Sequence, residues 1–267
     1  MIACRAVSSI FTMLLMIRLA GQLSIACMLN PMRWSLFFRR REVWIPTFRC
    51  WLFILLVCSS AFIWVVWHVH DFLAPDQPVD ARLLVIEGWM TPDQLDQAAT
   101  RIRRGHYDLV ITTGGPAPVD LYRPEPVPYA ELARDYLVRS GITGSLVTAV
   151  PVPESAQDRT YLSAVMVREW LEKSGHNVEA LDVFSSGVHS RRTRKLYQLA
   201  FGPQTRIGIT GARPTGYDPE SWWTTSTGAK TVIAETMSWI WTVLFFRPSV
   251  RGSHEEKWGT PPSATQS

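Results

Sequence analysis

An uncharged apolar stretch near the beginning of the chain most constrains how this sequence can fold. Residues 50–67, CWLFILLVCSSAFIWVVW, contain no charged side chain, and about 18 apolar residues are enough for one helix to cross a bilayer. Residues 68–81 contain three aspartates and no lysine or arginine, whereas arginines crowd the segment before the stretch. Positive charge favours the cytoplasmic side. We therefore expect a single-pass protein of the cell inner or plasma membrane, with a cytoplasmic N-terminus and an extracytoplasmic C-terminal domain.

Two cleaved signals are alternatives to a transmembrane helix. The apolar core of a signal peptide is normally shorter and is followed by a small-x-small site, whereas Trp64 and Trp67 are typical of interfacial anchors. In a lipoprotein signal a small residue would precede the cysteine, but Val57 precedes Cys58. The sequence therefore favours an uncleaved anchor.

The residues before the anchor divide into two segments. Residues 1–31 are apolar, but Arg5 and Arg18 interrupt them, so they contain no second clean span. Met32 begins MRWSLFFRRRE, a basic segment typical of an anchor with a cytoplasmic N-terminus. Our hypothesis is that residues 1–31 are a mis-assigned start or a disordered extension. Residues 32–70 then hold the basic flank and the transmembrane helix at 50–67.

Charge and cysteine content exclude several classes of function. Residues 1–67 hold seven arginines and one glutamate, so the remainder carries a charge of −2 although the whole chain carries +4. The sequence pI of about 9.0 therefore reflects the membrane flank and does not indicate nucleic-acid binding. All four cysteines precede residue 68. The C-terminal domain thus has no disulfide, thiolate nucleophile or cysteine zinc site.

After a linker at residues 71–80, short β-rich segments alternate with helical ones. This pattern predicts a parallel sheet with helices on both faces, an α/β domain over residues 81–247. In the first helix, Thr91 is the expected N-cap, Pro92 the first helical residue and Gln94 the partner that closes a capping box. The predicted strands are 81–87, 107–113, 145–152, 178–184 and 206–210.

The last helical segment and the tail are less strongly constrained. Residues 230–246 are too short for a second span, and Glu235 interrupts them. We expect a closing helix packed on the sheet, and a helix that touches the membrane surface stays open as the alternative. The composition of residues 248–267 predicts a disordered tail.

Polar residues follow four of the predicted strands, at residues 87–89, 112–115, 154–160 and 185–192. Ligands of open parallel sheets bind at the carboxyl ends of the strands, so we expect these turns to line one crevice. His189 and Arg192 lie three residues apart, on the packed side of a predicted helix. An inward arginine at the positive end of a helix is unfavourable unless an anion neutralises it. The anion is either a ligand, most plausibly one with a phosphate, or a carboxylate of the chain: Glu87, Glu154 or Asp158.

Four segments in this order resemble the YdcF/SanA/ElyC family: TTGG (112–115), YAELARDYL (129–137), VPESAQDRTYLSA (152–164) and SGVHSRR (186–192). The resemblance covers about residues 81–246. It implies a Rossmann-like doubly wound, mainly parallel sheet and, for exported members, anchoring by one N-terminal helix and a role in cell-envelope biogenesis. The chain departs from the family at its first turn, which reads Glu87-Gly88-Trp89 instead of being glycine-rich. Ala164 also lies near the position where the family often has an asparagine.

The residues and the resemblance together predict a site without naming a cofactor or a metal. Candidate catalytic residues are His189 as acid or base, with Asp158 and Glu87 as further carboxylates. An enzyme with these groups would suit phosphoryl or phosphate-ester chemistry, but no motif supplies a nucleophile. The alternative is a non-catalytic envelope module with an ion-paired cluster.

The expected partners are the membrane and an anionic envelope precursor, not nucleic acid, and the oligomeric state stays open. The candidate ligand-binding residues are Gly88, Thr113, Gly114, Gly115, Glu131, Glu154, Thr160, Ser186 and Arg192; for Glu131 a solvated helix carboxylate is an equal alternative.

Overall fold

The structure is a computed structural model that describes residues 46–118, 126–155 and 158–258. The predicted N-terminal extension (1–31), most of the basic flank and the end of the tail lie outside these residues. The chain divides into two compact units, residues 1–57 and 58–267. The boundary falls inside the first described helix, so the packing described below concerns residues 58–258.

This first helix, α2, spans Phe48–Leu73 and contains the predicted transmembrane segment. Among the described residues, α2 is the one helix long and apolar enough to cross a membrane, and no residue of its apolar 18-residue window is buried. The helix runs six residues past Trp67 and takes in the first three residues of the predicted linker. It ends two residues before Pro75, which cannot continue an α-helix.

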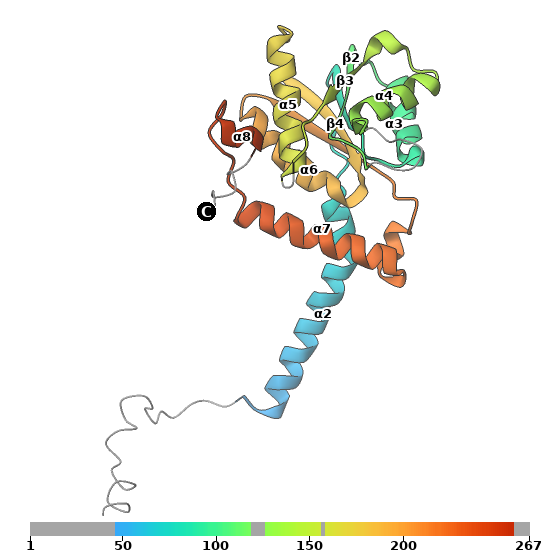
Figure 1. The fold of residues 1–267 in the computed structure, drawn as a ribbon. Helices are drawn as coiled ribbons and strands as arrows, with labels where there is room; N and C mark the ends of the chain where they lie inside the picture. The colour runs from blue at the N-terminus through green and yellow to red at the C-terminus, as the bar shows by residue number, and fades with distance from the viewer. Residues whose placement is uncertain (1–45, 119–125, 156–157, 259–267) are drawn as a thin grey trace, which may run out of the picture. The chain divides into compact units, whose positions relative to one another are not determined.

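Five parallel strands form the sheet: β1 (Leu83–Glu87), β2 (Leu109–Gly114), β3 (Val147–Pro151), β4 (Ala180–Ser186) and β5 (Arg206–Ala212). Their order is β3-β2-β1-β4-β5. The predicted α/β fold with a parallel sheet is therefore confirmed (Figure 1). The chain runs outward from β1 toward β3 and then returns to β4 beside β1, so the topological switch point lies between β1 and β4.

Helices cover both faces of the sheet because the central strands carry apolar side chains on both. Leu83 and Val85 of β1 enter one apolar cluster with α5 (Arg159–Lys173) and α6 (Ser190–Phe201). Leu84 and Ile86 enter a second cluster with α3 (Pro92–Arg104) and α4 (Tyr129–Arg139). Alternate residues of a strand point to opposite faces, and the sheet is buried between two helical layers.

The start of α3 confirms the predicted capping box. Thr91 is the N-cap and Pro92 the first helical residue, and the Thr91 backbone N–H donates to Oε1 of Gln94 at 3.3 Å. The amide nitrogen of Gln94 also donates to Oγ of Ser186 at 2.8 Å. One side chain therefore closes the helix start and fastens it to the end of β4.

The linker after α2 runs along the sheet before β1 begins. Gln77 forms an antiparallel bridge with Ile209 of β5. Val79 and Ala81 then donate their backbone N–H groups to the buried carboxylate of Asp182 in β4, at 2.8 and 3.1 Å. The linker is thus fixed to β4 and β5.

The last long helix, α7 (Ser226–Leu244), begins four residues before the predicted start. The expectation that it packs on the sheet is wrong, because α3 to α6 already cover both faces. It packs instead against α6 and two short 3₁₀ segments, η3 (Gly187–His189) and η4 (Pro219–Thr224). Figure 1 shows α7 crossing the C-terminal end of α2.

The predicted disordered tail is also wrong for its first part. A short helix, α8 (His254–Trp258), follows α7 and places Glu256 against α5. The Glu256 carboxylate forms two hydrogen bonds with the Arg168 guanidinium, at 2.9 and 3.1 Å, and the side chains are only 1% and 4% exposed. A buried cation requires a paired anion, so this segment is part of the fold.

We expect Glu256→Gln to lower the free energy of unfolding by about 3 kcal/mol, because the buried Arg168 would lose its hydrogen-bonded counter-ion and keep only the partly exposed Glu172 at 3.6 Å. Denaturant unfolding of the full-length protein in detergent micelles, followed by near-UV circular dichroism, measures this change. Glu255→Gln, an exposed neighbour on the same short helix, is the matched control and should change little. Equal, small effects of both variants would contradict a structural role for α8.

Candidate functional site

The candidate residues that contact one another lie at the switch point between β1 and β4. Glu87 is the last residue of β1 and Ser185 and Ser186 end β4. In open parallel sheets this position is where ligands bind. The polar cluster described below comes from β1, β4, η3 and the helices α5, α6 and α7.

Glu87 is a buried carboxylate, 2% exposed, at the centre of this cluster. It follows Leu83 and Val85 on the face covered by α5 and α6. The Ser185 hydroxyl donates to its Oε2, and the Thr193 hydroxyl lies 3.4 Å from both carboxylate oxygens. These hydroxyls offset part of the cost of burying the charge, so they hold Glu87 in place.

His189, the last residue of η3, contacts polar groups through both ring nitrogens. Its Nε2 lies 3.3 Å from the Thr160 hydroxyl and 3.9 Å from Oε1 of Glu87. Its Nδ1 lies 3.0 Å from Oε1 of Glu235. The His189 side chain is 11% exposed, and the Trp89 ring packs against it edge to face at 5.1 Å. Each ring nitrogen of His189 therefore has a carboxylate oxygen within 4 Å.

Arg192 and Glu235 form a bidentate ion pair between α6 and α7. Nε of Arg192 donates to Oε2 of Glu235 at 3.1 Å, and Nη2 donates to Oε1 at 3.2 Å. Nη2 also lies 2.9 Å from Nδ1 of His189. Burial alone would raise the pKa of Glu235, but its hydrogen bonds and charge interactions with His189 and Arg192 outweigh this effect and lower the pKa to about 2.

Glu235 corrects the sequence-based expectation for Arg192. We expected an anionic ligand or one of three carboxylates, Glu87, Glu154 or Asp158, as the partner, but the hydrogen-bonded anion is Glu235. The sequence carried a signal, because Glu235 is the one charged residue between 231 and 246 and a lone carboxylate in an apolar helix requires a partner. Sequence reasoning used this residue only as evidence against a second membrane span.

The 3₁₀ segment η3 reduces the unfavourable interaction between Arg192 and the positive end of the helix dipole. It runs directly into α6, so the helical segment begins at Gly187 and not at Ser190. Arg192 then lies beyond the first turn of this segment. The unfavourable interaction with the helix dipole is largely confined to that first turn, so Arg192 costs less at this position than the sequence pattern suggested.

The N-terminus of α5 adjoins the cluster through Thr160. Its N-cap, Asp158, has a left-handed backbone (φ 53°) and makes no side-chain cap hydrogen bond. Desolvation raises the pKa of Asp158, and the nearby charge of Arg192 offsets this only in part. The first turn of α5 also supplies Thr160, the hydroxyl next to His189. Backbone N–H groups at such a helix start favour an anion.

Two buried hydroxyls beside Glu87 have no partner among the described residues. Thr113, paired in register with Glu87, is 1% exposed, and its Oγ1 makes no hydrogen bond. The same holds for the hydroxyl of Tyr197, whose pKa is raised by burial and by the charge of Glu87. Buried polar atoms normally form hydrogen bonds with protein or water. These two hydroxyls could therefore bind a water molecule or a polar group of a ligand.

The other candidate residues lie near this sheet edge but outside the cluster. Glycine is required at position 88, since a Cβ there would lie 2.4 Å from the Tyr129 carbonyl oxygen. At Gly114 a Cβ would lie 2.9 Å from the Tyr129 Cβ, and the Gly115 carbonyl accepts from the Tyr129 N–H at 2.8 Å. These glycines allow the first residue of α4, Tyr129, to pack closely against the ends of β1 and β2. The remaining candidates are Ser186, bonded to Gln94, and the exposed Glu131 and Glu154.

Contacts therefore join Glu87, Thr160, His189 and Arg192, with Asp158 within electrostatic reach. Sequence reasoning missed Ser185, Thr193 and Glu235.

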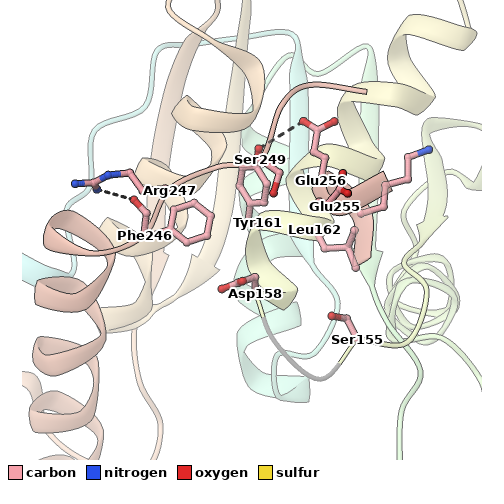
Figure 2. Close-up of a pocket in the computed structure, with 10 residues that line it drawn as sticks. Ser155, Asp158, Tyr161, Leu162, Phe246, Arg247, Ser249, Glu255 and Glu256 are labelled. Carbon is pink, nitrogen blue, oxygen red and sulfur yellow. Dashed lines mark hydrogen bonds between the residues drawn. The ribbon is translucent and has the colours of Figure 1, made fainter. Parts of the chain in front are cut away.

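A cavity of about 40 Å³ lies beside the N-terminus of α5, and Figure 2 shows Asp158, Tyr161 and Phe246 around it. It has room for water but is far smaller than the roughly 300–1,000 Å³ of ligand pockets. A larger cavity of about 500 Å³ is lined by Arg101, Tyr107 and Thr210 among others, and by none of the candidate residues.

No model of a known protein family matches this chain, and a search of curated proteins finds no match to it. The fold and the geometry of the cluster therefore carry the functional argument.

The depressed pKa of Glu235 predicts a specific loss of stability in acid. Its charged form stabilises the fold, so this contribution is fully present above pH 4.5, its ordinary value, and is lost as the pH falls toward about 2. Over this window we expect the wild-type protein to lose roughly 3 kcal/mol more than Glu235→Gln, measured by denaturant unfolding at stepped pH. Glu131→Gln, which removes an exposed carboxylate, should follow the wild type. Parallel losses in wild type and Glu235→Gln would contradict the pairing.

Proposed function

We propose that this chain is a single-pass membrane protein of the YdcF/SanA/ElyC type. In this proposal its α/β domain lies on the extracytoplasmic side of the inner or plasma membrane and binds a phosphate-bearing ligand of cell-envelope biogenesis at the carboxyl edge of its sheet. One observation carries the proposal: Thr160, His189 and Arg192 converge beside the N-terminus of α5 at the switch point. The anchor is the apolar helix α2, and the orientation rests on the arginines that precede it.

Three groups support a phosphate-bearing ligand. At the start of α5 the N-cap residue, Asp158, makes no side-chain cap hydrogen bond, and the backbone N–H groups of a helix start favour an anion. In the described part of the chain, Nη1 of Arg192 makes no hydrogen bond, so the guanidinium keeps donors although Glu235 holds its other edge. The Thr160 hydroxyl and Nε2 of His189 face each other at 3.3 Å and could both bind a phosphate oxygen.

If the ligand is a phosphate ester, a water molecule would attack the phosphorus and release a proton to solvent, while His189 would donate a proton from Nε2 to the ester oxygen that leaves. Glu235 would orient the ring through Nδ1, as a carboxylate does in a hydrolytic triad, and Nη2 of Arg192 lies 2.9 Å from the same nitrogen. Glu87 would act as a positioning group, because hydroxyls occupy its carboxylate and the side chain is buried. Entry to His189 would require the half-exposed Trp89 to move.

A second candidate is a non-catalytic envelope module whose cluster serves the fold. The Arg192–Glu235 pair favours it, since the two charges neutralise each other and link α6 to α7. Under this alternative, removing either charge destabilises the protein and no anion binds.

Thermal unfolding of the full-length protein in detergent micelles separates the two candidates. The probes are inorganic phosphate, pyrophosphate and farnesyl diphosphate, and a probe at 100 times its dissociation constant stabilises the fold by about 2.7 kcal/mol. We expect at least one probe to raise the melting temperature of the wild type. Thr160→Val, which leaves the ion pair intact, should weaken binding, and so should Arg192→Ala, by roughly ten- to hundred-fold.

Lys195→Ala is the matched control, because this half-buried cation lies on α6 and makes no hydrogen bond to the cluster in the described residues. It should bind the probe as the wild type does. If no probe shifts the melting temperature while Arg192→Ala and Glu235→Ala both lower it, ligand binding is refuted and the ion-paired module is favoured.

The orientation is tested with reporter fusions after Phe246. We expect an alkaline phosphatase fusion to be active and a green fluorescent protein fusion to be dark, because the first requires export and the second requires the cytoplasm. Fusions before residue 46 should give the opposite result. An inactive phosphatase with a fluorescent partner after Phe246 would overturn the topology.

A further inference from the structure

We infer that α7 lies in the membrane interface, with an exposed apolar stripe of its surface seated in the lipid bilayer. This inference rests on the proposed anchoring by α2 and adds a second membrane contact, which the span alone does not require.

The stripe follows the helical period along one side of α7. Its members lie at positions i, i+4, i+7, i+8 and i+11, which fall on one face of an α-helix. Each is between 42% and 62% exposed, although all are large and apolar. The stripe consists of Ile233, Met237, Ile240, Trp241 and Leu244. Phe245 extends it past the end of the helix and is 65% exposed.

The protein itself occupies the opposite face of α7 over its first three turns, whereas Val243 near the end of that face is 45% exposed. Val232 is fully buried there, and Trp239 packs with it against the end of α2. Glu235 points from the same side to His189 and Arg192. The domain therefore fixes the rotation of α7 about its axis and leaves the stripe outward.

The contacts between α7, η4 and α2 lie where α2 leaves its uncharged stretch. Val66 and Val69 join Val232 and Trp239 in one apolar cluster, and Phe72 packs edge to face on Trp239. The indole N–H of Trp222 in η4 donates to the Val66 carbonyl at 3.1 Å. Because the uncharged stretch ends at Trp67, these contacts place α7 at the level where α2 enters the interface.

Lipid fits this surface better than water or a second copy of the chain. The contacts with Val66, Val69 and Phe72 hold α7 beside the candidate span of the same molecule, so anchoring alone brings α7 to the bilayer surface. Lys230 is exposed near the start of α7 and Arg247 follows its end, positions from which cations reach headgroups. Amphipathic helices of this kind lie with their apolar side about 5–10 Å into the interface. The exposed Trp223 and Trp241 are of the type of residue enriched at that depth.

The orientation of α7 sets the height of the candidate site above the membrane interface. Glu235 faces away from the stripe, so the His189 cluster would lie about one helix diameter, roughly 10 Å, above the interface. A phosphate-bearing ligand could then reach the cluster from the headgroup layer of the same membrane.

Spin labels on the full-length protein in phosphatidylcholine/phosphatidylglycerol vesicles test the inference. The native cysteines are replaced by serine, and single cysteines are introduced by Met237→Cys and Leu244→Cys on the stripe. Ser174→Cys, exposed after the end of α5, is the aqueous control, and Val57→Cys within the span is the lipid control. Collisions with oxygen report lipid, and collisions with a water-soluble nickel chelate report solvent.

We expect labels at 237 and 244 to resemble the label at 57, with an oxygen-to-nickel collision ratio several-fold above that at 174. If they resemble 174 while 57 stays in lipid, the inference is overturned and the anchor stands. If 57 is also in water, the proposed anchoring fails as well. Dipolar broadening between labels at 237 would show that a second copy covers the stripe, which also overturns the inference.

Discussion

The ion pair between Arg192 and Glu235 is the interaction on which the arrangement of the site depends. It joins α6, which covers the sheet, to α7, which does not contact the sheet extensively, and it orients His189 between two carboxylates. A carboxylate in an apolar helix is unfavourable unless it is paired, so Glu235 fixes which face of α7 turns toward the domain. The apolar stripe of α7 lies on the opposite face and therefore points away from the domain. The cluster and the apolar surface of α7 are therefore two consequences of one interaction.

Local patterns in the sequence predicted most of the fold. The strands carry β-branched runs between helical segments, and α3 begins at a capping box whose three residues are adjacent in the chain, so no long-range information was required. The parallel sheet followed because such alternation leaves few other arrangements. The apolar stretch that contains α2 was equally clear, since its length and lack of charge are local properties.

The parts that sequence reasoning missed depend on contacts between distant residues. Glu235 lies 43 positions from Arg192, and Glu256 lies 88 positions from Arg168. A single sequence contains no record of such pairs, so Arg192 was matched with carboxylates of the other turns and the tail was predicted to be disordered. Placing His189, Thr160 and Glu87 at one sheet edge required only the rule for parallel strands. The resemblance to an envelope-associated family stays a proposal.

The path of the linker has a consequence for where the domain presents its working surface. After α2 the chain runs antiparallel to β5, with Gln77 beside Ile209, and Asp182 fastens it before β1 begins. Because the linker runs antiparallel to β5, and β1 is parallel to β4 and β4 to β5, the chain reverses its direction between the linker and β1. The loops at its far end thus come back toward the point where the anchor arrives. If the chain entered β1 directly from α2, the loops after the carboxyl ends of the strands would lie about one strand length away from the end of α2. The reversal in the linker instead places these loops on the side of the domain where α2 ends.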